Sequence, residues 1–219
     1  YNATGFVNGS ATAGLKKCFR GAFTTTCSTT VDFTSDILII ESGHNLTVTT
    51  GGTLTCGAIW INSGATLTVS GGTLNCGPIT KNGTITYTSG SINATYANTG
   101  YTIASTTYNN LTISGTGVFS VGGNLIVTGT LSIATSSILN LNGNNLQAVN
   151  AFSGTGTIKG SSTSRIYITG SAAGTFYMDQ TTPLTSNRLK YLGLASNATA
   201  TIGNALVIYA DTAYSGILE

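Results

Sequence analysis

The side chains that could carry out acid–base chemistry are few, and most of them fall within one short segment. Asp32, Asp36 and Glu41 lie within ten residues of one another, and His44 follows them. Hydrolysis of a glycosidic bond requires two carboxyl groups that face the same bond at a defined distance. Asp32 and Asp36 are separated by an even number of positions, so one face of a strand could carry both. The complete set of carboxylates is Asp32, Asp36, Glu41, Asp179, Asp211 and Glu219.

A non-catalytic interpretation of this segment is favoured. Asp32 and Asp36 fit exposed charges that protect the edge strand of a sheet, and Glu41-Ser42-Gly43-His44 fits a turn into the strand that follows. The sequence contains no nucleophile elbow, no phosphate-binding loop and no metal-ligand spacing of His and Cys. We therefore predict no catalytic residue, no metal site and no cofactor, and we expect the protein not to be an enzyme.

Four cysteines form the second group of reactive side chains. Cys56 and Cys76 lie one repeat apart at equivalent positions, and adjacent strands are about 4.8 Å apart, which is close enough for a disulfide. Cys18 and Cys27 would then close a short loop. We predict the pairs Cys18–Cys27 and Cys56–Cys76, although four cysteines allow other connectivities, and the alternative is a stack of free thiols inside the coil. Disulfides would place the protein outside a reducing cytoplasm.

Aromatic side chains offer a candidate sugar-binding strip, because aromatic faces pack against pyranose rings. The alternative, which such residues adopt more often, is that they fill rungs or corners of the core. The candidate glycan contacts are Trp60, Tyr87, Tyr96, Tyr101 and Tyr108.

Threonine triplets suggest another kind of binding surface. Thr47-Val48-Thr49, Thr53-Leu54-Thr55 and Thr66-Leu67-Thr68 each place two hydroxyl side chains around an apolar one. A flat face that presents such triplets on successive coils is typical of an ice-binding surface. The later part of the sequence is not expected to continue them.

An internal repeat indicates which elements position these residues. The repeat is seen where Thr53-Leu54-Thr55-Cys56-Gly57 returns as Thr73-Leu74-Asn75-Cys76-Gly77. A second motif, Leu46-Thr47-Val48-Thr49, returns as Leu67-Thr68-Val69-Ser70 after nearly the same number of residues. This period suits one coil of a parallel β-solenoid, in which strands stay in register and turns vary in length. We therefore predict an all-β fold, a parallel β-helix or β-solenoid with coils of about 20 residues.

Residue alternation and composition agree with this fold. Apolar and polar residues alternate in 45–49, 65–69 and 129–133, which is typical of strands buried on one face. Only 6% of the 219 residues are charged, against about 25% in an average globular protein. The net charge of +2 is too small for nucleic acid binding, and no apolar run approaches the roughly 20 residues that a bilayer requires. We expect neither nucleic acid binding nor membrane insertion.

The chain is predicted to have two parts. Residues 1–30 lack the repeat and carry the basic cluster Lys16, Lys17 and Arg20, so we predict a capping or docking segment there and a β-solenoid over residues 31–219. The last residues stop within a longer repeat of roughly 80 residues. We therefore expect either a segment of a longer array or a subunit whose next coil comes from a neighbouring copy.

The second half contains Thr-, Gly- and Asn-rich strings at 108–117, 139–144 and 154–164. Over residues 108–219, and more loosely over 45–90, the chain resembles the repetitive regions of large surface proteins of Bacteroidota, many of which are exported by the type 9 route. The resemblance implies an extracellular β-solenoid stalk or adhesin array. Asp211-Thr212-Ala213 is similar to the short pattern that Bacteroidota use for O-linked sugars, which makes Thr212 a candidate glycosylation site.

Three functional hypotheses follow. The leading one is an extracellular structural protein, a stalk or self-assembling filament subunit of a bacterial cell surface. In its filament form, residues 1–30 dock end to end on residues 214–219 of the next copy. The second is an adhesin segment that binds glycans or another surface through a flat solenoid face. The third is a polysaccharide-degrading β-helix that uses Asp32 or Asp36.

Overall fold

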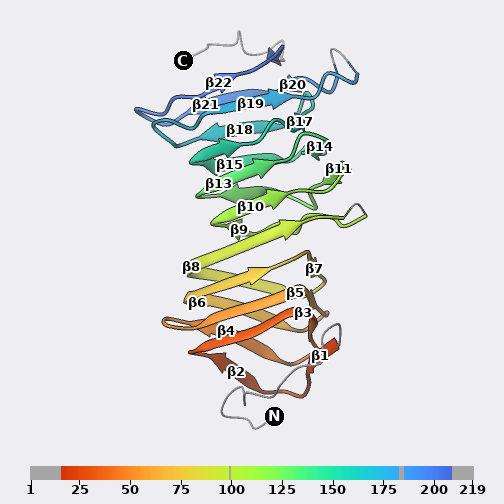
Figure 1. Ribbon diagram of the computed structural model, residues 1–219, viewed down its shortest axis with the longest axis vertical. Coiled ribbons are helices and arrows are strands. Elements are labelled where there is room, and N and C mark those ends of the chain that lie inside the picture. Colours follow the sequence, from red (N-terminus) through yellow and green to blue (C-terminus); the bar gives the residue numbers. More distant parts are fainter. Residues whose placement is uncertain (1–15, 99, 183–184, 209–219) are drawn as a thin grey trace. The chain divides into compact units, whose positions relative to one another are not determined.

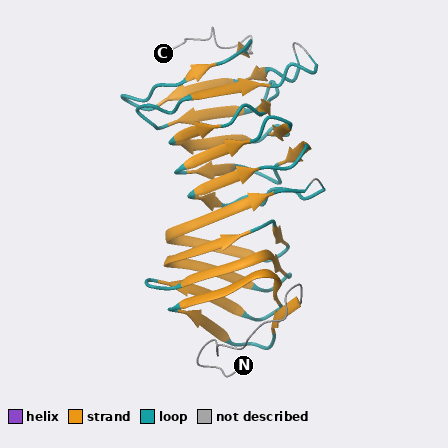
Figure 2. Ribbon diagram, viewed as in Figure 1, coloured by secondary structure: helices purple, strands orange, loops and turns teal. Residues whose placement is uncertain are grey.

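A computed structural model describes residues 16–98, 100–182 and 185–208. The chain divides into two compact units, Tyr1–Thr95 and Tyr96–Glu219. All regular elements of the described residues are β-strands, and none is a helix (Figure 2). The strands pair in parallel and stack as successive coils, so the predicted all-β solenoid fold is confirmed.

The first unit combines the longest strands of the structure, which reach 13 residues, with shorter ones (Figure 1). Its strands are β1 (Lys16–Phe19), β2 (Thr24–Cys27), β3 (Thr30–Ile40), β4 (Asn45–Thr49), β5 (Thr53–Ile61), β6 (Thr66–Cys76), β7 (Ile79–Lys81) and β8 (Thr84–Tyr96).

The second unit is built from shorter strands. They are β9 (Thr107–Tyr108), β10 (Asn110–Ile113), β11 (Gly117–Ser120), β12 (Leu125–Val127), β13 (Thr130–Ile133), β14 (Ser137–Asn140), β15 (Asn145–Val149), β16 (Ala151–Ser153), β17 (Thr157–Lys159), β18 (Arg165–Ile168), β19 (Thr175–Met178), β20 (Arg188–Leu189), β21 (Tyr191–Leu194), β22 (Thr201–Ile202) and β23 (Val207–Ile208).

Each coil of the first unit has three faces. One face consists of β2, β4 and the first halves of β6 and β8. A second face consists of the first halves of β3 and β5 and the second halves of β6 and β8. The third face consists of β1, the second halves of β3 and β5, and β7. A long strand such as β6 therefore bends at its middle and contributes to two faces.

The register of the first unit matches the sequence repeat. Thr53 pairs with Thr73 and Cys56 pairs with Cys76, as the repeat predicts. Leu46 pairs with Leu67 on another face, again at the interval seen in the sequence. The predicted equivalence of these positions is confirmed, because identical side chains occupy the same place on successive coils.

The interior of the first unit is filled by these stacked side chains. Leu46 and Leu67 are fully buried neighbours on one face, and Leu54, Leu74 and Ile92 are fully buried neighbours on another. Parallel strands hold such side chains about 4.8 Å apart. Burial of each apolar side chain stabilises the fold by about 1.5–3 kcal/mol.

The Cys-Gly step of the repeat marks a corner of the coil. The cysteine points inward, and the glycine that follows lies where the chain turns toward the third face. A Cβ atom on Gly77 would overlap the carbonyl oxygen of Gly57 one coil away. Only glycine allows the backbones of two coils to approach this closely, which explains why the dipeptide returns with the repeat.

The second unit also has three faces. Its strand orders are β10-β13-β16, β11-β14-β17-β19-β22 and β9-β12-β15-β18-β21, with a further pair β20-β23. Most of its coils keep the length of the sequence repeat, as the pairs Ile138–Thr157 and Leu125–Leu146 show. The coil that joins Arg165 to its partner Tyr191 is longer. The extra residues of this coil lie in the loop that follows β19.

Candidate functional site

The two aspartates predicted to share a strand face lie on opposite sides of β3. A register shift between Phe33 and Ile37 inserts extra residues into this strand. As a result Asp32 is exposed while Asp36 is buried, with only 1% of its surface accessible. The paired-carboxylate arrangement is therefore wrong, and so is the interpretation of Asp36 as an exposed charge. β1 pairs only with residues 37–40 of β3, so within the described residues the half of β3 that carries Asp32 has β5 as its one strand partner. The interpretation as an exposed charge on an edge strand therefore fits Asp32 but not Asp36.

Each of these carboxylates has a partner within the chain. The Oδ1 atom of Asp32 accepts hydrogen bonds from the backbone and the hydroxyl group of Thr34. These bonds lower the pKa of the Asp32 carboxyl group. Asp36 lies 3.8 Å from the Nζ atom of Lys17, which comes from the neighbouring strand β1.

The predicted turn at residues 41–44 is confirmed. The amide of His44 donates to the carbonyl oxygen of Glu41, and Gly43 has a positive φ of 82°. The carboxylate of Glu41 pairs with Arg20 at 3.1 Å. The ring of His44 is buried, and its Nε2 atom lies 2.9 Å from the hydroxyl of Thr25. His44 therefore joins two coils of the first unit.

All four cysteines are free thiols. Cys56 and Cys76 are in-register neighbours, but they are not bonded to each other, and Cys18 and Cys27 are not bonded either. The predicted disulfides are absent from this structure, and the Cys56–Cys76 pair adopts the alternative arrangement, a stack of buried thiols. Burial raises the pKa of Cys56 to about 12 and also raises the pKa of Cys76.

The five candidate glycan contacts do not form one exposed strip. Tyr96 and Tyr108 are fully buried in the second unit, where their hydroxyl groups lie 3.3 Å apart. They fill the core, as the alternative interpretation expected. Tyr87 is half-buried and donates to the carbonyl oxygen of Gly90. Lys16 lies 5.0 Å from the ring centroid of Trp60. Of these five residues only Tyr101 is exposed.

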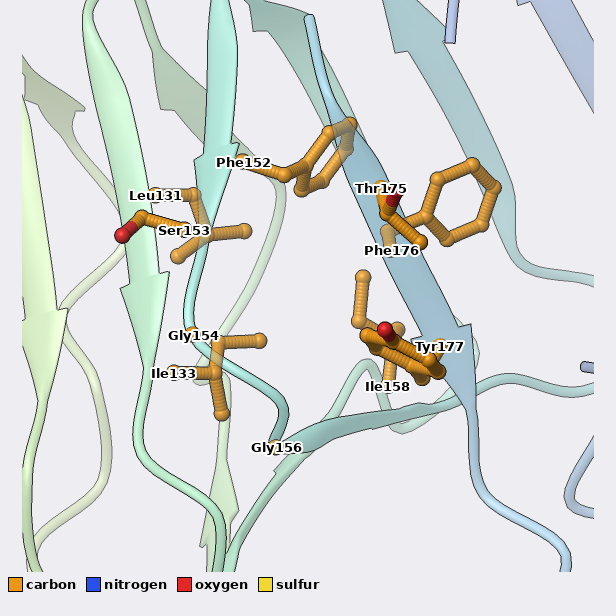
Figure 3. A pocket seen from close by; sticks show the side chains of 10 residues that line it. All are labelled: Leu131, Ile133, Phe152, Ser153, Gly154, Gly156, Ile158, Thr175, Phe176 and Tyr177. Carbon is orange, nitrogen blue, oxygen red and sulfur yellow. The ribbon is translucent and has the colours of Figure 1, made fainter. Parts of the chain in front are cut away.

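The second unit contains an apolar void and a groove. The void, about 10 Å³, lies beside the rings of Phe152 and Phe176, whose centroids are 5.0 Å apart (Figure 3). A void of this size is at the lower limit for one water molecule, so it is a packing feature of the core. The groove, about 520 Å³, lies beside the loop that follows β19.

The polar groups of this groove hold its own loop in place. Asp179 accepts hydrogen bonds from the amide and hydroxyl groups of Thr181, at 3.1 and 2.7 Å. The side-chain amide of Asn204 bonds to both backbone groups of Met178, each at 2.7 Å. These bonds account for the polarity of the groove without a ligand, so we assign none to it.

The first unit carries a regular array of hydroxyl side chains. We call it the threonine face, and it lies on the outer side of β2, β4 and the first halves of β6 and β8. Two columns run across four strands in register. The first column is Thr24, Asn45, Thr66 and Thr84, and the second is Thr26, Thr47, Thr68 and Thr86.

The threonine face differs from the sequence prediction in two respects. The triplets at 47–49 and 66–68 do lie on one face, but the triplet at 53–55 lies on β5, which belongs to another face. Residues 84–86 continue the array on β8, although no continuation was expected. Two further threonine triplets in the sequence, Thr24-Thr25-Thr26 and Thr84-Ile85-Thr86, could have indicated the full extent of the face. The second triplet follows residues 66–68 after a coil that is shorter than the main repeat.

Most hydroxyl groups of this face remain available for an external partner. Within the described residues, Thr68 donates to the side chain of Asn45 at 3.3 Å. The other threonines of the two columns make no side-chain hydrogen bond to any described residue. None of the four strands that form the face contains a charged residue. The adjacent face differs, because it carries Asp32 and a hydrogen bond between Asn75 and Asn93.

Three other findings bear on function. A comparison with family models, curated proteins and solved structures finds no match to this chain. Within residues 16–98, 100–182 and 185–208, no three His, Cys, Asp or Glu side chains gather as a metal site would require. In the same residues there is no helix long and apolar enough to cross a membrane. The candidate O-glycosylation site Thr212 and the docking residues 214–219 lie outside the described residues.

Proposed function

We propose that this chain is a structural module of a bacterial cell surface, an extracellular stalk segment or filament subunit that acts mechanically and not as a catalyst. The observation that carries the proposal is the stacking of buried side-chain ladders on all three faces of the coil. In such a stack each coil contacts only its neighbours, so the module can be lengthened without a new core. The low content of charged residues, 6%, fits outer faces in which like charges are not stacked on every rung.

The filament form of this proposal requires a docking end. In the described residues β1 and β2 each have one strand partner, β3 and β4 respectively. Strands with one partner can pair with another chain unless something covers them. A docking role for residues 1–30 stays a prediction, and within that segment β1 and β2 are themselves rungs of the first unit.

Electron microscopy and sedimentation of the purified chain test the filament form. We expect linear assemblies that grow with protein concentration, and we expect deletion of residues 1–30 to prevent them. The deleted chain should keep its β-rich circular dichroism spectrum, because β3 and β4 retain their other partners β5 and β6. Fibres that persist after the deletion would refute docking through this segment.

A second function is favoured by the threonine face. We infer that the module also binds an external surface through this face, as an adhesin segment would. A glycan is a weaker partner for it, because the two columns of the face contain no aromatic side chain that could stack on a sugar ring. The test is binding of the chain to a panel of solid surfaces, namely cellulose, chitin, hydroxyapatite and ice. Substitution of Thr47 should reduce the binding, and substitution of Thr55 on the adjacent face should not.

A further inference from the structure

We propose that the threonine face of the first unit binds ice. This inference rests on the proposed surface-binding function and names its ligand as crystalline water. The face consists of the eight residues of the two columns defined above, seven threonines and Asn45.

The first argument is the two-dimensional spacing of the side chains. Parallel strands place in-register residues about 4.8 Å apart, and alternate residues of one strand are about 6.6 Å apart. The threonines therefore form a rectangular grid fixed by backbone hydrogen bonds. A crystalline surface of water molecules likewise repeats its hydrogen-bonding groups at fixed intervals in two directions. A grid of this kind can place several hydroxyl groups on lattice positions at the same time.

The second argument is the chemistry of the side chain. Threonine is β-branched, so its χ1 angle is restricted and its hydroxyl and methyl groups are held in fixed directions. Each hydroxyl can donate one hydrogen bond and accept two, so it can both donate to and accept from the water molecules of an ice surface. Little conformational entropy is lost when such a face meets a rigid lattice.

The third argument is the charge of the face. β2, β4, β6 and β8 contain no Lys, Arg, Asp or Glu. A mineral surface made of ions is recognised by opposite charge, which this face lacks. A polysaccharide is recognised largely by aromatic stacking, and the two columns contain no aromatic side chain. An uncharged lattice of hydrogen-bonding groups is the partner that complements the face.

The hydroxyl groups are also free to take part. Thr26, Thr47, Thr66, Thr84 and Thr86 make no side-chain hydrogen bond to any residue in the described part of the chain. Thr26, Thr84 and Thr86 are exposed, while Thr47 and Thr66 are half-buried between neighbouring rungs. Water that hydrates these hydroxyl groups can become the first layer of the crystal.

The test is partition of the full chain into a slowly growing ice hemisphere, together with thermal hysteresis. The test variants are Thr47→Tyr and Thr68→Tyr, which place a bulky ring at the centre of the grid. Tyrosine has a high β-propensity, so the strands should persist. The matched control is Thr55→Tyr, an equally half-buried outward threonine on the adjacent face. If a central variant fails to fold, Thr26→Tyr at an exposed position of β2 replaces it.

We expect the wild-type chain and Thr55→Tyr to partition into ice and each face variant to fall about tenfold, the change that about 1.4 kcal/mol produces. Equal losses for Thr55→Tyr and Thr47→Tyr would overturn the assignment to this face. Exclusion of the wild-type chain from ice would overturn the ice proposal. If that chain still binds cellulose or chitin through Thr47, the surface-binding function survives and ice is not its ligand.

Discussion

Replacement of Leu67 by alanine tests the inward ladder most directly. Leu67 is fully buried and lies in register between Leu46 on β4 and Ile85 on β8. Loss of its outer carbon atoms costs about 2.4 kcal/mol in transfer free energy, at about 0.8 kcal/mol for each buried methylene. The residual cavity adds about 1–2 kcal/mol, because strands at hydrogen-bonding distance cannot close the gap. We expect the free energy of unfolding to fall by about 4 kcal/mol.

The assay is guanidinium unfolding followed by tryptophan fluorescence. Trp60 is the single tryptophan of the chain and lies in β5, so its signal reports on the first unit. The matched control is Thr68→Ala, the next residue, whose side chain points outward and donates one long hydrogen bond. It should cost less than about 1 kcal/mol. Equal losses for the two variants would show that the assignment of inward and outward residues on β6 is wrong.

Three further outcomes are expected. Burial raises the pKa of the Cys56 thiol from its usual 9.0 to about 12, so the contribution of the protonated thiol to the free energy of unfolding is full below pH 9 and falls as the pH rises to 12. Chemical unfolding at several pH values in this range measures the change. A free energy of unfolding that does not vary with pH would contradict the burial of this thiol. Lys17→Met removes the lysine that pairs with the buried Asp36 and should cost about 3 kcal/mol. Arg20→Met breaks an exposed ion pair and should cost under about 1 kcal/mol, and thermal melting compares the two variants. Gly77→Ala should lower the melting temperature sharply, since its Cβ atom would overlap backbone, and an unchanged value would contradict the corner geometry.

The fold could be predicted from the sequence repeat because the repeat and the pairing of strands between coils have the same physical cause. Side chains that stack on neighbouring coils must be alike in size and polarity, so Cys56 and Cys76 return at the interval that separates the strands. The Gly57–Gly77 echo follows from the close approach of two backbones at a corner. These relations need no knowledge of the rest of the chain.

The candidate site could be predicted only in part, because which face a residue occupies depends on bends and bulges. The shift in β3 moved Asp36 inside although two-residue alternation placed it beside Asp32. Thr84 of β8 pairs with Thr66 across a coil shorter than the main repeat, so the period of the repeat does not reveal this continuation. The burial of Tyr96 depends on contacts within the second unit that strand alternation does not encode.

The in-register stack has a consequence for how such a chain can change over time. Positions 53 and 73 are structurally equivalent, so unequal recombination between them would remove or duplicate one complete rung. The junction would still join a threonine to a leucine. Loss of residues 53–72 would bring Leu46 into register with Ile85 in place of Leu67, so the neighbouring rungs would still meet side chains of a similar type. The length of the first unit can therefore change by one coil at a time with little loss of folding stability. The number of coils is then a property that can change between generations by recombination.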